Sequence, residues 1–149
     1  MTTTVVWTGV DEPRMEIAHV DLEGSTMRAR GTQIGVAYEL RYELEPGRLR
    51  AEVVGGPCLD IGVGESDFFD LAYSPLFNSL PILAGLESAA DFVMTFVDVP
   101  SLEVERAEQR YEPLGDGRVR FRSGSFTAEL EFGDDRLVTH YEGLARRVG

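Results

Sequence analysis

At 149 residues the chain has the length of one domain, and its 43% hydrophobic content is typical of a globular protein and excludes general disorder. Its 26 acidic and 14 basic side chains give a net charge of −12, which disfavours contact with nucleic acid or with an anionic membrane surface. Hydrophobic runs stay short of the ~20 residues that a transmembrane helix needs. The N-terminus lacks the pattern of a signal peptide, and a single cysteine, Cys58, cannot form an internal disulfide. We therefore expect a cytoplasmic protein without an integral membrane segment.

The first half of the chain is predicted to form short antiparallel strands. Arg14–Glu23 carries apolar residues at alternate positions, although Ala18 and Val20 shift the register, which predicts a bulge or a bend. Val36–Leu44 alternates strictly, with apolar and aromatic residues on one face and mostly charged residues on the other. A Pro-Gly turn leads from it into Arg48–Val54, and these two runs predict a β-hairpin.

Further short runs separated by glycine-containing turns predict the remaining strands. They are Val5–Trp7, Cys58–Val63, Ser66–Leu71, Asp91–Val99, Leu102–Glu112, Arg118–Ser123, Phe126–Phe132 and Leu137–Tyr141. Strands at this spacing are typical of an antiparallel sandwich, a barrel or a strongly curved sheet.

Between the two β-rich halves lies an apolar stretch, Asp70–Leu86, that is interrupted by Pro75 and Pro81. The prolines disfavour both a long helix and a central strand. We expect an irregular or helical plug near residues 70–90, with Leu83–Ala90 as the best helix candidate. The predicted fold is thus all-β, a single domain over residues 1–149 whose antiparallel, strongly curved sheet forms a half-barrel or open barrel. The apolar residues of the plug either cap a core or also line a ligand cavity.

No motif of catalytic, metal-binding or cofactor-binding chemistry stands out. His19 and His140 stand alone without metal-ligand spacing, and Cys58 has no basic neighbour in sequence. What does stand out is a set of aromatic residues expected on the inner faces of the strands. They either fill a tight core or line a groove for an apolar ligand.

Several stretches together resemble a family of bacterial proteins described as putative glycolipid-binding proteins. They are VVWTGVDEPRMEIAHV near the start, SPLFNSLPI at 74–82, VDVPSLEVERAEQRYEPL at 97–114 and SGSFTAELEFGDDRLVTHYEGLARR at 123–147. The resemblance implies an antiparallel β half-barrel, similar to bacterial lipoprotein carriers, and a glycolipid as ligand. Where the family has an arginine pair after LPI, this chain has Leu83-Ala84, so an arginine grip on a phosphate or sugar-acid head is not expected there.

From these observations we expect a non-enzymatic protein that binds a lipid or amphiphile without a cofactor. The ligand that the resemblance implies is a glycolipid. The expected apolar wall consists of Trp7, Tyr38, Phe77, Phe126 and Tyr141, and the expected polar contacts are Glu16, Asn78, Gln109 and Arg110.

Two alternatives stay open from the sequence. One is an enzyme acting on a small apolar substrate in the same cavity, with His140 or Glu16 as general base. The other is an oligomerising module that pairs as a homodimer through a sheet edge or an apolar patch.

Overall fold

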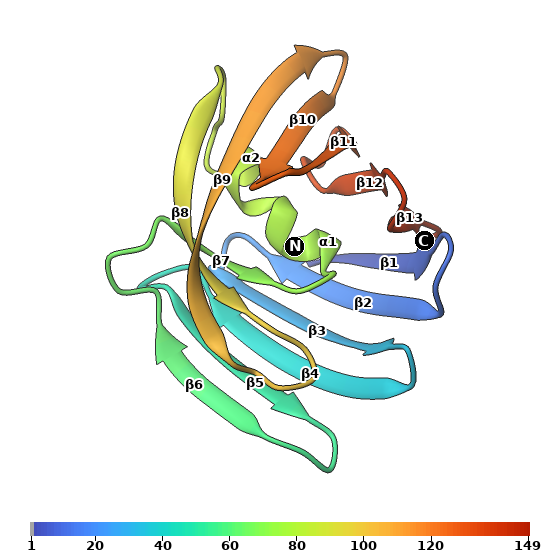
Figure 1. Ribbon diagram of the computed structural model, residues 1–149, viewed down its shortest axis with the longest axis vertical. Helices are drawn as coiled ribbons and strands as arrows, with labels where there is room; N and C mark the ends of the chain where they lie inside the picture. The colour runs from blue at the N-terminus through green and yellow to red at the C-terminus, as the bar shows by residue number, and fades with distance from the viewer. Residues whose placement is uncertain (1) are drawn as a thin grey trace.

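The structure, a computed structural model, describes residues 2–149 and consists almost entirely of β-strands in one sheet (Figure 1). In chain order the strands are β1 (Thr3–Gly9), β2 (Arg14–Asp21), β3 (Thr26–Gln33), β4 (Val36–Glu43), β5 (Arg48–Val53), β6 (Cys58–Gly62), β7 (Phe68–Leu71), β8 (Ala90–Val97), β9 (Val104–Gly115), β10 (Arg118–Ser123), β11 (Phe126–Phe132), β12 (Val138–Tyr141) and β13 (Ala145–Arg147). Two single-turn helices, α1 (Pro75–Asn78) and α2 (Leu80–Leu83), follow β7.

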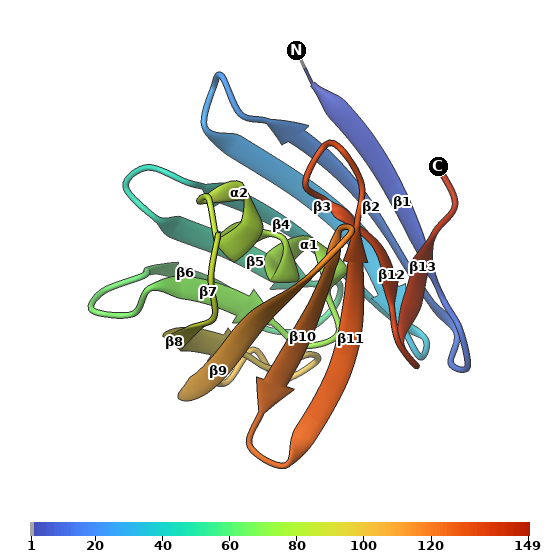
Figure 2. The ribbon, with the colours of Figure 1, turned by 90° about the horizontal axis from the view of Figure 1, so that it is seen from above.

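The 13 strands form an open sheet in the order β6-β5-β4-β3-β2-β1-β13-β12-β11-β10-β9-β8-β7. Every neighbouring pair is antiparallel except β7 and β8, which are parallel. The sheet curves strongly and is not closed into a barrel, and both views show α1 and α2 on its inner side (Figures 1 and 2). The prediction of an all-β, antiparallel, strongly curved fold with a short plug is therefore confirmed.

The apolar and polar residues that alternate in the hairpin of β4 and β5 indicate which side of the sheet is buried. Tyr38, Leu40 and Tyr42 of β4 are buried, whereas the residues between them are exposed. Their partners on β5 are likewise buried, so each inner side chain packs against another across the hairpin.

Strand β2 differs from the prediction. Its pairing with β1 and β3 runs without interruption, so the predicted bulge is wrong. Glu16, Ala18 and Val20 form the buried face, while Met15 is 46% exposed on the outer face. The error arose because Glu16 lies on the buried face and Met15 on the exposed face, whereas a charged residue normally indicates the exposed face of a strand and an apolar residue the buried face.

The helix candidate at Leu83–Ala90 is also wrong, because the helical turns come earlier. Proline occupies one of the first two positions of both α1 and α2, where the missing N–H breaks no helical hydrogen bond. Gly85, at φ 95°, then ends the helical segment.

Hydrogen bonds from both halves hold the plug against the sheet. Gln33 donates from Nε2 to the Ala72 carbonyl at 2.8 Å, and the Val138 amide donates to Ser79 Oγ at 3.2 Å. The Val138 carbonyl in turn accepts from Trp7 Nε1 at 2.7 Å. Within residues 2–149, no helix has the length and apolar character that crossing a membrane would require.

Candidate functional site

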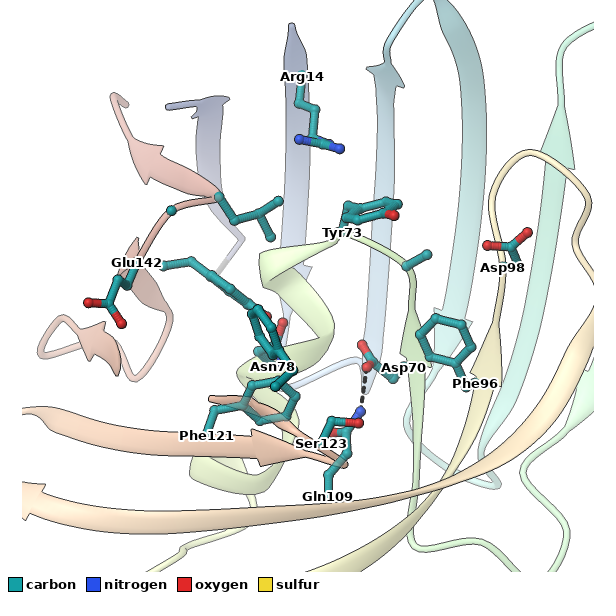
Figure 3. A pocket seen from close by; sticks show the side chains of 15 residues that line it. Arg14, Asp70, Tyr73, Asn78, Phe96, Asp98, Gln109, Phe121, Ser123 and Glu142 are labelled. Atoms are coloured by element: carbon teal, nitrogen blue, oxygen red, sulfur yellow. Dashed lines mark hydrogen bonds between the residues drawn. The ribbon is translucent and has the colours of Figure 1, made fainter. Parts of the chain in front are cut away.

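An open cavity of about 490 Å³ lies beside the plug, on the side of the second half of the sheet. Figure 3 shows the 15 side chains that line it, contributed by the start of β2, the plug, β7 to β12 and the loop after β12. Its volume lies in the range of small-molecule binding sites.

Aromatic side chains form one wall of this cavity. Phe121 of β10 packs against Phe126 of β11 and Tyr141 of β12, each with ring centroids 6.2 Å apart in an edge-to-face arrangement. Phe96 of β8 lines the opposite part of the cavity. Phe126 is 50% exposed although it is large and apolar, so half of its surface is available to a ligand.

A chain of hydrogen bonds between side chains forms the polar floor. Asn78 Nδ2 donates to the Tyr111 hydroxyl at 3.0 Å, and that hydroxyl donates to Gln109 Oε1 at 3.2 Å. Gln109 Nε2 donates to Asp70 Oδ2 at 2.6 Å (Figure 3). These residues come from α1, β9 and β7, so the tertiary fold is needed to assemble the floor.

Asp70 is the most deeply buried charged group of the cavity, with 8% of its surface exposed. Burial raises the pKa of this carboxyl from 3.8 to about 7, although the hydrogen bonds from Gln109 and from the Leu71 amide act in the opposite direction. Among the described residues, no basic side chain forms an ion pair with it. Burial and the nearby Asp70 also raise the pKa of Tyr111 and Tyr141, so both phenols stay neutral.

At the mouth of the cavity, the Arg14 guanidinium lies over the ring of Tyr73, with its central carbon 4.4 Å from the ring centroid (Figure 3). Two further carboxylates line the rim. Asp98 accepts a hydrogen bond from Ser101 Oγ at 2.8 Å, and Glu142 accepts one from a backbone amide of β11 at 3.0 Å. The lining of the cavity thus includes three carboxylates and one guanidinium.

A second buried carboxylate, Glu16, lies outside this cavity. It accepts hydrogen bonds from the Tyr38 hydroxyl, from Ser74 Oγ at 2.8 Å and from the Leu76 amide. Burial raises the pKa of Glu16, while these hydrogen bonds lower it. The space beside it measures only about 10 Å³, which is about the room that one water molecule needs.

The structure gathers four of the nine residues predicted for ligand binding in the cavity: Asn78, Gln109, Phe126 and Tyr141. The other five lie elsewhere. Trp7, Glu16 and Tyr38 border the 10 Å³ space, and Phe77 is buried in the core against Tyr42. Arg110 points to the outer surface, where it pairs with Asp91 at 3.0 Å.

Phe96 and Phe121 belong to the aromatic set expected from the sequence on the inner faces of the strands, although they are not among the nine predicted ligand contacts, and Asp70 was not singled out at all. The one available signal for Asp70 was a carboxylate within the apolar run Phe68–Leu71. The alternative catalytic base, His140, does not line the cavity and lies 3.5 Å from Glu131. Within residues 2–149, no group of three or more potential metal ligands is found, and Cys58 is exposed.

Comparison with known proteins places these observations in a family. A crystal structure of a DUF1089 family protein from Pseudomonas aeruginosa is similar to this chain, with a TM-score of 0.62 and 21% sequence identity over 98% of this chain and 93% of that chain. This likeness supports the fold. A search of curated proteins found no match. The family model described as "Putative glycolipid-binding" matches residues 59–147, more than half of the sequence. The chain therefore belongs to the family of putative glycolipid-binding proteins.

Proposed function

We propose that the protein binds an amphiphilic small molecule in the 490 Å³ cavity. The observation that carries this proposal is the division of the cavity into two chemical surfaces. Phe121, Phe126 and Tyr141 offer an apolar wall, and Asp70 and Gln109 offer a polar floor. A ligand with an apolar chain and a polar end matches both surfaces.

The description of the family supports a lipid-like ligand with a sugar-containing head. The half-exposed ring of Phe126 supports the same proposal, because contact with an alkyl chain would remove its apolar surface from water. Asn78 and Gln109 supply amide groups of the kind that fix the orientation of a bound polar group.

The proposal is tested with N-phenyl-1-naphthylamine, an uncharged probe whose fluorescence rises in apolar surroundings. We expect saturable binding at one site per chain. Phe126→Ala should weaken the affinity about tenfold, because it removes one aromatic contact surface worth roughly 1.5 kcal/mol.

Val104→Ala is the matched control, since Val104 is 46% exposed on β9 but does not line the cavity. It should leave the affinity unchanged. Equal effects of the two substitutions, or a fluorescence rise that never saturates, would contradict the proposed site.

Extraction of the natively purified protein with organic solvent, followed by mass spectrometry, would identify a bound amphiphile. A stoichiometric alkyl-chain compound in the extract is the expected result. A clean extract together with no uptake of added probe would indicate that the aromatic residues serve packing alone.

A further inference from the structure

Asp70 has an environment that packing alone does not explain. Its carboxylate receives hydrogen bonds from Gln109 Nε2 and from the Leu71 amide, yet no basic side chain within the described residues neutralises it. A buried carboxylate without a counter-charge destabilises the fold when it is ionised. Because Asp70 borders an open cavity, a bound ligand can supply the missing charge.

The surroundings of Asp70 favour a positive charge over a negative one. Asp98 and Glu142 line the same cavity, whereas Arg14 lies at the mouth on the ring of Tyr73. An anionic head would meet three carboxylates in the cavity. Aromatic side chains line the cavity as well, and the face of an aromatic ring attracts a cation.

We propose that the polar end of the amphiphile carries a protonated amine that pairs with Asp70 at the floor of the cavity. This inference rests on the proposed function and specifies the class of ligand. An amino sugar joined to an alkyl chain would combine such an amine with the glycolipid named in the family description. The Gln109 amide holds Asp70 Oδ2 in place, so that the carboxylate is positioned before the ligand arrives.

Amine binding should then depend on the protonation of Asp70. The groups that face this carboxyl are Gln109 and Tyr111 of β9, Asn78 of α1 and Tyr141 of β12. The remaining charged residues of the cavity are Arg14, Asp98 and Glu142.

With a pKa of about 7, Asp70 is about one-tenth ionised at pH 6 and about nine-tenths ionised at pH 8. The affinity for an ammonium group that requires the ionised form should therefore rise about tenfold over this interval.

The experiment compares octylamine, octan-1-ol and octanoate by isothermal titration calorimetry at pH 6 and pH 8. These three probes share a chain length and carry a positive, a neutral and a negative end. We expect octylamine to bind at least tenfold more tightly than the other two at pH 8, and about tenfold more tightly at pH 8 than at pH 6. Octan-1-ol or octanoate binding as tightly as octylamine would overturn the amine assignment and leave the amphiphile site standing. No saturable binding of any probe would overturn both.

Asp70→Asn, which keeps the shape of the side chain, should lower the octylamine affinity at pH 8 about tenfold and remove its dependence on pH. Binding of octan-1-ol should not change. Glu87→Gln is the control, since it removes one negative charge at an exposed position outside the cavity. An unchanged octylamine affinity in folded Asp70→Asn protein would overturn the proposal. If the variant fails to fold, the comparison of the three probes at two pH values in the unmodified protein still decides it.

Discussion

Two buried carboxylates, Glu16 and Asp70, lie on the inner side of the same sheet, and burial raises the pKa of each. Each accepts hydrogen bonds from uncharged donors, and in the part of the chain that the structure describes neither forms an ion pair with a basic group. They differ in the adjacent space. Glu16 borders about 10 Å³, whereas Asp70 lines a cavity of about 490 Å³.

The difference separates a structural carboxylate from one suited to a ligand. Glu16 joins β2 to β4 through Tyr38 and to the plug through Ser74 and Leu76, so its donors come from elements that must stay together. Asp70 has fewer donors and faces open space. Burying a carboxylate without a counter-charge costs stability, and such groups are frequent at functional sites. We therefore expect Asp70 to take part in ligand binding at the cavity.

The largest loss of stability is expected from Glu16→Leu. This substitution leaves three buried donors without an acceptor, from Tyr38, Ser74 and the Leu76 amide. At roughly 1 kcal/mol or more for each group, the free energy of unfolding should fall by at least about 3 kcal/mol. Urea denaturation monitored by circular dichroism measures this change.

Glu16→Gln is the conservative variant at the same position. Its amide oxygen still accepts hydrogen bonds, so the loss should be about 1 kcal/mol. If Glu16→Leu were as stable as the unmodified protein, the claim that Glu16 fastens the plug to the sheet would be wrong.

Asp70→Asn should raise the free energy of unfolding at high pH, in contrast to the substitutions at Glu16. Because the pKa of Asp70 rises from 3.8 to about 7 on folding, the folded state holds the proton longer, and stability is lost as pH rises from about 4 to about 7. The full penalty is about 4 kcal/mol, and it already includes the stabilising hydrogen bonds from Gln109 and the Leu71 amide, because these contribute to the pKa of about 7.

The Asn variant should therefore be about 4 kcal/mol more stable than the unmodified protein at pH 8, with the advantage falling to about 2 kcal/mol near pH 5.5 and vanishing near pH 4. Urea titrations at these pH values provide the measurement. A difference that does not change between them would show that Asp70 titrates in the ordinary range.

Removal of one tyrosine hydroxyl beside Glu16 and one beside the cavity compares the two regions directly. Tyr38→Phe removes a buried donor from Glu16 and should cost about 1.5 kcal/mol of unfolding free energy. Tyr141→Phe removes a hydroxyl that borders the cavity and should change it by less than about 0.5 kcal/mol. Thermal unfolding of the two variants side by side tests this, and a larger loss at Tyr141 would reverse the roles assigned to the two regions.

Arg110→Ala should have the smallest effect. Arg110 and Asp91 form an ion pair on the outer surface, with 41% and 75% of their side chains exposed, so its loss should cost less than about 0.5 kcal/mol. Binding of N-phenyl-1-naphthylamine should not change. A clear loss of affinity would bring the outer face of β9 into the site.

The sequence predicted the strands well where burial alternates regularly. The bounds of β10 and β11 match the predicted runs, and the hairpin of β4 and β5 differs by one residue at two of its ends. Strand β3 was missed, because its buried positions include small and polar residues such as Ala29 and Gln33 that give a weak hydrophobic signal.

The candidate site was predicted in part, for a physical reason visible on β9. Gln109 and Arg110 are neighbours in one motif, but successive strand residues point to opposite faces, so one enters the cavity and the other the solvent. The environment of Asp70 depends on Gln109 of β9, which lies far from it in the sequence. No local pattern could show that this carboxylate is buried without a counter-charge.

The most direct test of a ligand site at this cavity is an NMR titration of ¹⁵N-labelled protein with octylamine at pH 8. We expect saturable shifts of the Gln109 side-chain amide and of the backbone amides of Ser123 and Phe126, all of which line the cavity. The amides of Glu52 and Asp60, on β5 and β6, should not move. Shifts centred on those outer strands, or no saturable shift at the cavity, would contradict a ligand site there.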